Sequence, residues 1–195
     1  MNILIKKILL AIPAVVFFLN ANAQGDFVIT VSGDSILCKI TSFSNGKGKY
    51  LSDDMIKPEK ISVEKIREVY VAKQNIFYRA VYINFDKKPT YLTVLEKGKI
   101  SLYQKIVTVN INSYNGVNTT ATTWYIGKGS DYVYDIKGTD LHPGKSSTDP
   151  KADFAKLLID NKAAYDKFIG DDKFSFAQIR NIVHFYNTGN LLEGK

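Results

Sequence analysis

The segment Tyr91–Tyr103, with the sequence YLTVLEKGKISLY, predicts a β-hairpin. The two expected strands of this hairpin, Tyr91–Leu95 and Ile100–Val109, are rich in the β-branched and aromatic residues that are typical of strands. The four residues between them, 96–99, include a glycine, which suits a turn. Strands that are joined by so short a turn pair antiparallel. The segment therefore predicts an antiparallel sheet.

Strand signals of the same kind surround this hairpin. Apolar and polar residues alternate on both sides of Gly33-Asp34, which predicts a second hairpin. The run Ile76–Phe85 is apolar on both faces, as in a central strand that is covered on both sides. The other expected strands are Phe27–Val31, Ile36–Phe43, Lys49–Leu51, Ile61–Val63, Glu68–Ala72, Trp124–Ile126 and Tyr132–Ile136, the last two joined across Gly127–Gly129.

The period of the apolar residues changes to a helical one after Gly138. Asp149-Pro150 predicts a helix start, with an N-cap followed by proline at the first helical position. A break near Asp160-Asn161 divides this helix from a second one. Ser175 and Gln178 have the spacing of a capping box at the start of the last helix.

Strands followed by helices are typical of an α+β fold. We expect a mainly antiparallel β-sheet in residues 24–137, either barrel-like or divided into two packed β lobes. We expect helices that pack on the sheet in residues 138–190, and a flexible tail in residues 191–195. With 45% hydrophobic residues the chain can bury a core without disulfide bonds.

The N-terminal residues 1–23 have the pattern of a secretory signal peptide. Lys6 and Lys7 precede the apolar run Ile8–Leu19, and the small-residue pattern Ala21-Asn22-Ala23 follows it. The run is shorter than the roughly 20 residues that a membrane-spanning helix needs. We therefore expect cleavage after Ala23, a periplasmic or secreted protein, and no transmembrane span.

The charged residues do not suggest a nucleic-acid partner. The formal net charge is +7, but the lysines are scattered singly or in short pairs such as Lys87-Lys88. A protein that follows a phosphate backbone would carry a basic stripe. We expect no nucleic acid among the partners.

Side chains for catalysis or metal binding are few and dispersed. The chain has one cysteine, Cys38, and two histidines, His142 and His184. This set does not provide a zinc site or a nucleophile with its base. We therefore expect no catalytic residues, no metal and no cofactor.

Cys38 is interpreted as a small apolar residue of a strand. In strand alternation it shares a face with Ile36 and Ile40, which favours burial of the thiol. An intermolecular disulfide is the alternative, because an exported protein enters an oxidising compartment.

Tyrosine is abundant in the expected strands, and aromatic side chains that face solvent can bind glycans or proteins. Core packing and cross-strand pairing are the alternative role of these rings. The polar stretch 110–123 is expected to be an exposed connection that contacts a partner or is a plain surface loop. The candidate ligand-binding residues are Tyr114, Trp124, Tyr132 and Tyr134.

Three segments together resemble a family of small secreted or periplasmic proteins of Bacteroidetes that has no assigned biochemical activity. They are GDSILCKI at Gly33–Ile40, YLTVLEKGKISLY at Tyr91–Tyr103, and the closing helix Phe176–Asn187 with its IV-x-x-YN pattern. Ser35 stands where the family pattern has Thr, and the closing region lacks an Asp-Cys pair that many members have. The resemblance implies a cell-envelope or secreted location and a strand-rich module followed by helices, and it brings no catalytic residues.

Two functional classes follow. The first is a non-catalytic cell-envelope module that binds a protein, a glycan or a lipid-derived ligand. The second is a hydrolase that acts on envelope polymers with carboxylates that folding brings together. The oligomeric state and the identity of the ligand stay open at this point.

Expression of the full chain in a bacterium with an export pathway tests the leader. We expect the exported protein to begin at Gln24, as read by N-terminal sequencing and intact mass. Retention of residues 1–23 in the recovered protein would contradict the assignment.

Overall fold

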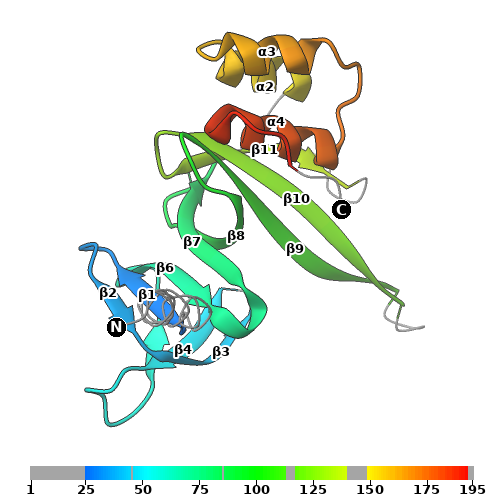
Figure 1. Cartoon of the computed structure of the whole chain (residues 1–195). Coiled ribbons are helices and arrows are strands. Elements are labelled where there is room, and N and C mark those ends of the chain that lie inside the picture. The colour runs from blue at the N-terminus through cyan, green and yellow to red at the C-terminus, as the bar shows by residue number, and fades with distance from the viewer. Residues whose placement is uncertain (1–24, 45, 85, 113–116, 140–148, 193–195) are drawn as a thin grey trace, which may run out of the picture.

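The computed structural model describes residues 25–44, 46–84, 86–112, 117–139 and 149–192. Strands come first and helices last (Figure 1). The strands are β1 Phe27–Thr30, β2 Ser35–Leu37, β3 Lys39–Ser44, β4 Lys47–Leu51, β5 Glu59–Ile61, β6 Ile66–Val71, β7 Ile76–Ile83, β8 Thr90–Glu96, β9 Ile100–Asn112, β10 Val117–Lys128 and β11 Tyr132–Gly138. The helices are the 3-10 turn η1 Ala72–Gln74 and α2 Pro150–Leu158, α3 Lys162–Ile169 and α4 Phe176–Thr188. The predicted α+β class, with a mainly antiparallel sheet before C-terminal helices, is confirmed.

The large sheet has eight strands in the order β11-β10-β9-β8-β7-β6-β1-β2. Strand β11 also pairs with β7, in parallel, at Tyr132–Tyr82 and Val133–Ile83. This pairing closes the five strands β7 to β11 into a ring. Each of these strands contributes one buried side chain to an apolar cluster that holds the ring together: Val81, Leu92, Tyr103, Tyr125 and Val133.

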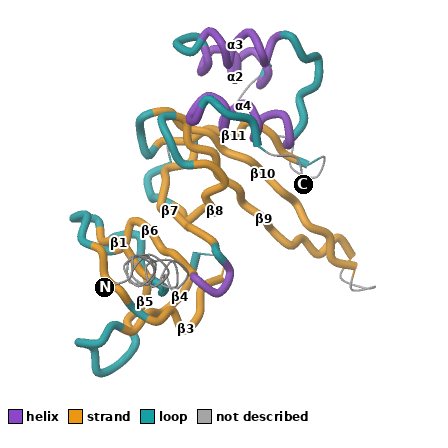
Figure 2. The backbone as a smooth tube through the Cα atoms, viewed as in Figure 1, coloured by secondary structure: helices purple, strands orange, loops and turns teal. Residues whose placement is uncertain are grey.

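A small sheet of three strands, β3-β4-β5, packs beside the first strands of the large sheet (Figure 2). The predicted strand 36–43 is divided at Cys38 between the two sheets, with β2 in the large sheet and β3 in the small one. Asp26 fixes this division, because its carboxylate accepts hydrogen bonds from the Ile40 and Ala72 amides, each at 2.8 Å.

The three α-helices of the described chain begin at side-chain caps, of which Asp149 and Ser175 were predicted, and Asn161 lies at the predicted break between the first two helices. The side chains of Asp149, Asn161 and Ser175 accept the backbone N–H three residues later at 3.0, 3.2 and 3.2 Å. The Gln178 side chain does not complete a reciprocal capping box with Ser175; it donates to the Asp171 carbonyl at 3.5 Å. Gly189, with φ +79°, ends α4 in the left-handed conformation that glycine adopts easily.

The helices pack on β9, β10 and β11, and their apolar faces form the largest core cluster. Phe154, Leu158 and Phe168 are fully buried there against Leu102 and Ile126 of the sheet. In Figure 1 the helices lie over one end of the large sheet, while the small sheet lies at the other end.

Asn187 of α4 joins the helices to the first residue of β9. Its side-chain oxygen accepts the Ile100 N–H at 3.1 Å and its amide donates to the Ile100 carbonyl at 2.7 Å. The side chain thereby occupies the place of a neighbouring strand. Gly98 is required beside it, because a Cβ at this position would collide with the Asn187 amide.

Strands β9 and β10 form a long hairpin that extends away from the rest of the chain (Figure 1). The expectation that residues 110–123 form an irregular surface connection is wrong for 110–112 and 117–123, which are strand. Asparagine is disfavoured in strands, although threonine is favoured, and the pairing of twelve β10 residues with β9 overrides the polar character of this stretch.

Replacement of Asn187 tests the link between helix and strand. Asn187→Leu leaves the buried N–H and C=O of Ile100 without partners, so we expect the free energy of unfolding to fall by about 3 kcal/mol. Urea denaturation measures the change. Asn190→Leu, at an exposed position just after the helix, is the matched control and should change it by less than about 0.5 kcal/mol. Equal losses in the two variants would contradict the role of Asn187.

Candidate ligand-binding groove

A groove of about 750 Å³ opens between the small sheet and the part of the large sheet where β8 and β9 diverge. This volume lies within the range of ligand-binding clefts. We call it the β3/β9 groove. Its lining residues in the described chain are Phe43, Ser44, Gly46, Gln74, Ile76, Tyr78, Thr90, Tyr91, Thr93, Gln104, Lys105, Ile106, Val107 and Thr108.

Three aromatic rings form one wall of the β3/β9 groove. The ring of Phe43 lies 4.6 Å from that of Tyr78 and 5.4 Å from that of Tyr91, at interplanar angles of 57° and 81°. The Tyr91 hydroxyl donates to the Ile66 carbonyl at 2.6 Å, and burial raises its pKa. These contacts fasten β3 to the large sheet and fix the width of the groove.

The polar groups of the β3/β9 groove are almost all uncharged. Threonine and serine hydroxyls and the Gln74 and Gln104 amides line it, and Lys105 is the charged residue among its described lining. General acid–base catalysis of glycoside or peptide hydrolysis uses carboxylic acids or imidazole. The described lining therefore supports binding and offers no acid–base pair.

Several acidic side chains form ion pairs that join separate elements of the fold. Glu68, which is buried, contacts Arg79 at 3.1 Å and Lys97 at 2.9 Å, and Arg79 also contacts Asp131 at 2.6 Å. These contacts join β6, β7, the end of β8 and the turn before β11. Both oxygens of the Glu68 carboxylate are occupied by these cations, and Glu68 does not line the β3/β9 groove, so we assign it a structural role.

A second ion-pair group connects α4 to β8. Glu96 accepts from Arg180 Nε at 2.7 Å and lies 2.9 Å from His184 Nδ1. A third group surrounds Asp160, where hydrogen bonds from Lys128, Lys99 and Tyr186 lower the pKa of the carboxyl. Each group joins a helix or its adjoining turn to the sheet, so we assign both a structural role.

The predicted binding residues that the structure describes lie in two places, with Trp124 in the core and Tyr132 and Tyr134 on the surface of β11. Tyr114 lies outside the described residues. Trp124 is 7% exposed and its ring packs 4.7 Å from Phe176, so it belongs to the core beneath α4. Tyr132 and Tyr134 are 45% and 41% exposed on one face of β11, and Tyr132 stacks on Tyr82 at 5.0 Å.

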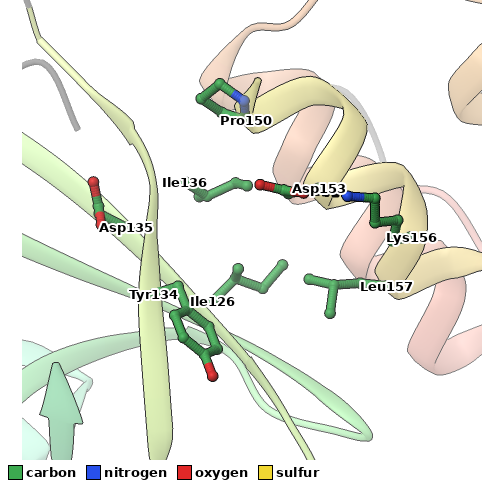
Figure 3. Close-up of a pocket in the computed structure, with 8 residues that line it drawn as sticks. All are labelled: Ile126, Tyr134, Asp135, Ile136, Pro150, Asp153, Lys156 and Leu157. Carbon is green, nitrogen blue, oxygen red and sulfur yellow. Dashed lines mark hydrogen bonds and ion pairs between the residues drawn. The ribbon is translucent and has the colours of Figure 1, made fainter. Parts of the chain in front are cut away.

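Tyr134 borders a smaller hollow of about 380 Å³ between β11 and α2 (Figure 3). Ile126 of the sheet and Leu157 of the helix point toward one another across it, beside the ion pair of Asp153 and Lys156 at 2.7 Å. Its apolar walls continue the interface between helix and sheet. The larger β3/β9 groove combines apolar and hydrogen-bonding groups, as binding sites do, and is therefore our candidate site.

The β3/β9 groove could not be predicted from the sequence because its residues come from four separate segments. Tyr78 and Tyr91 were recognisable as strand aromatics, but nothing in the sequence places Phe43 against them. Residues 104–108 have the pattern of an ordinary strand. Nothing in the sequence indicates that β8 pairs with only part of this strand.

Cys38 is partly buried against the core of the small sheet, as strand alternation predicted. Burial raises the pKa of its thiol to about 11, and the negative charge of Asp26 acts in the same direction. The thiolate required of a nucleophile is therefore scarce at neutral pH. Within the ranges that the structure describes, no three His, Cys, Asp or Glu side chains are grouped as metal ligands, and none of the helices is long and apolar enough to cross a membrane.

Comparison of the chain with protein-family models, with curated proteins and with solved structures finds no match in any of the three.

Alkylation of the single cysteine tests its environment. A pKa raised from 9.0 to about 11 lowers the thiolate fraction about 100-fold, so iodoacetamide at pH 8 should modify native Cys38 about 100-fold more slowly than the urea-unfolded chain. Mass spectrometry measures both rates. Native and unfolded rates within threefold of each other would contradict the burial of the thiol.

Proposed function

We propose that this protein is an exported cell-envelope protein without catalytic activity, and that it binds a partner in the β3/β9 groove. The partner is a protein, a glycan or a lipid-derived ligand of the envelope. The observation that carries the proposal is the groove itself, which is about 750 Å³ in volume and is lined by aromatic and uncharged polar side chains.

The proposed location depends on the sequence of residues 1–23, in which two lysines precede an apolar run and a small-residue cleavage pattern. Export supplies the setting of the proposed function: the mature chain 24–195 meets envelope polymers and other exported proteins. The resemblance to small secreted or periplasmic proteins supports the same location.

A hydrolase that acts on envelope polymers is the competing class. Such an enzyme needs two carboxyl groups that face the same cavity at a suitable separation. In the described chain Glu68, Glu96 and Asp160 each contact Lys or Arg within 2.9 Å, and none of them lines the β3/β9 groove. This arrangement favours the binding module.

A groove variant tests the proposal. The mature protein 24–195 is immobilised and exposed to an envelope extract, and the retained protein and sugar are quantified. Thr108→Arg places a long cation at an exposed position in the groove, so we expect the retained component to fall at least about tenfold. Ser35→Arg makes a comparable change on β2, outside the groove. This control variant should retain the same component as the wild type does.

Two results would contradict the proposed function. Equal retention by the wild type and Thr108→Arg would show that the retained component binds outside the β3/β9 groove. Release of soluble fragments from envelope polymers by the wild-type protein would assign it to the hydrolases.

A further inference from the structure

Strand β9 is paired unequally on its two sides. On one side it pairs with β10 along its length, from Ile100 to Asn112. On the other side it pairs with β8 only at Leu102, Tyr103 and Gln104. From Lys105 onward one edge of β9 therefore has no neighbouring strand in the described chain, and this edge borders the β3/β9 groove.

The hydrogen bonds of Thr122 identify which backbone groups point to the open edge. The Thr122 carbonyl accepts from the Thr139 N–H at 3.0 Å, and its N–H donates to the Thr139 hydroxyl at 3.3 Å. Both groups of Thr122 thus point away from β9. Because Ile106 is its partner in the register, the N–H and C=O of Ile106 point away from β10.

The hydrogen bonds of Ile100 identify the same edge of β9 independently. Its N–H and C=O bind Asn187, on the side opposite β10. Backbone groups in a strand alternate between the two sides, so Ile100, Ile106 and Thr108 direct theirs to the same edge. Asn187 occupies this edge at Ile100, β8 occupies it next, and no described strand occupies it at Ile106 and Thr108.

The side chains beside this open edge suit a polypeptide. Ile106 and Val107 are 51% and 37% exposed, and across the groove lie Phe43 and Tyr78. The Phe43 and Tyr78 rings are tilted by 57° and pack on each other, so they form an apolar wall and not a flat platform for sugar rings. Apolar side chains at alternate positions of an added strand would contact this wall.

We propose that the β3/β9 groove binds an extended segment of another exported protein, which adds as a strand to β9 through the backbone of Ile106 and Thr108. This inference rests on the proposed function and names its ligand class. The one-sided part of β9, residues 105–112, is about 27 Å long at roughly 3.4 Å per residue, enough for a strand of ordinary length. Lys105 disfavours segments with positive charge.

A phage-displayed library of random twelve-residue peptides is the first probe. We expect the mature wild-type protein to enrich peptides with alternating apolar residues and few cations. Each enriched peptide is then synthesised with N-methyl groups on every second residue, in the two possible phases. Strand addition predicts that one phase loses binding at least about tenfold and that the other retains it, because only alternate N–H groups face β9.

A proline variant tests the protein side. Ile106→Pro removes an N–H that faces the open edge and leaves the bonds to β10 in place, so we expect the fold to persist and peptide affinity to fall about tenfold. Ile106→Thr retains the N–H and is the matched control, with affinity within about threefold of the wild type. Circular dichroism verifies the fold, and the N-methyl series on the wild type decides the question if the proline variant is unfolded.

Three outcomes overturn strand addition. The first is the absence of enriched peptides, or equal effects of both N-methyl phases. The second is a dimer of the free protein that Ile106→Pro dissociates, since the edge would then be occupied by a second copy. The third is binding of neutral envelope oligosaccharides that Thr108→Arg abolishes and Ile106→Pro preserves, in which case the proposed binding function stands and only the ligand class fails.

Discussion

The need of β9 for hydrogen-bonding partners on the side away from β10 organises this structure. Two groups of the described chain, and then water, meet this need in turn along the strand. The Asn187 side chain binds Ile100, strand β8 binds the following residues, and beyond Gln104 the described chain supplies no strand. In the free protein water must satisfy the remaining groups, since unpaired backbone N–H and C=O groups are costly. The first two solutions build the fold and the third creates the candidate site.

The surrounding contacts hold this arrangement in place from both ends. At one end Asn187, Glu96 and Asp160 tie α4 and the turn before α3 to the β8–β9 hairpin. At the other end Phe43 packs on Tyr78 and Tyr91 and holds the small sheet against β7 and β8. The point where β8 and β9 separate lies between these two attachments. These two attachments restrain the walls of the groove, and restraint of a binding site before the ligand arrives lowers the entropic cost of binding.

Local signals in the sequence were sufficient for the order of strands and helices and for most of the elements, but not for the strand residues 110–112 and 117–123 or for the division of strand 36–43 at Cys38. The glycine-containing turn after Glu96, the caps at Asp149 and Ser175, and the alternation around Cys38 all predicted features of the structure. Contacts between distant segments were not predictable from such signals. The parallel pairing of β11 with β7, the burial of Trp124 under Phe176, and the ring contacts of Phe43 depend on tertiary packing. The site belongs to this second group, because it is defined by where a strand loses its neighbour and not by a residue type.

Amide hydrogen exchange of the free protein, prepared as residues 24–195 and resolved by residue with NMR, tests the central claim most directly. The N–H groups of Lys105 and Val107 point to β10, whereas those of Ile106 and Thr108 point to the open edge. The account predicts that Ile106 and Thr108 exchange at least about tenfold faster than Lys105 and Val107. Equal protection of all four amides would mean that another part of the chain or a second copy already covers this edge, and would contradict the account.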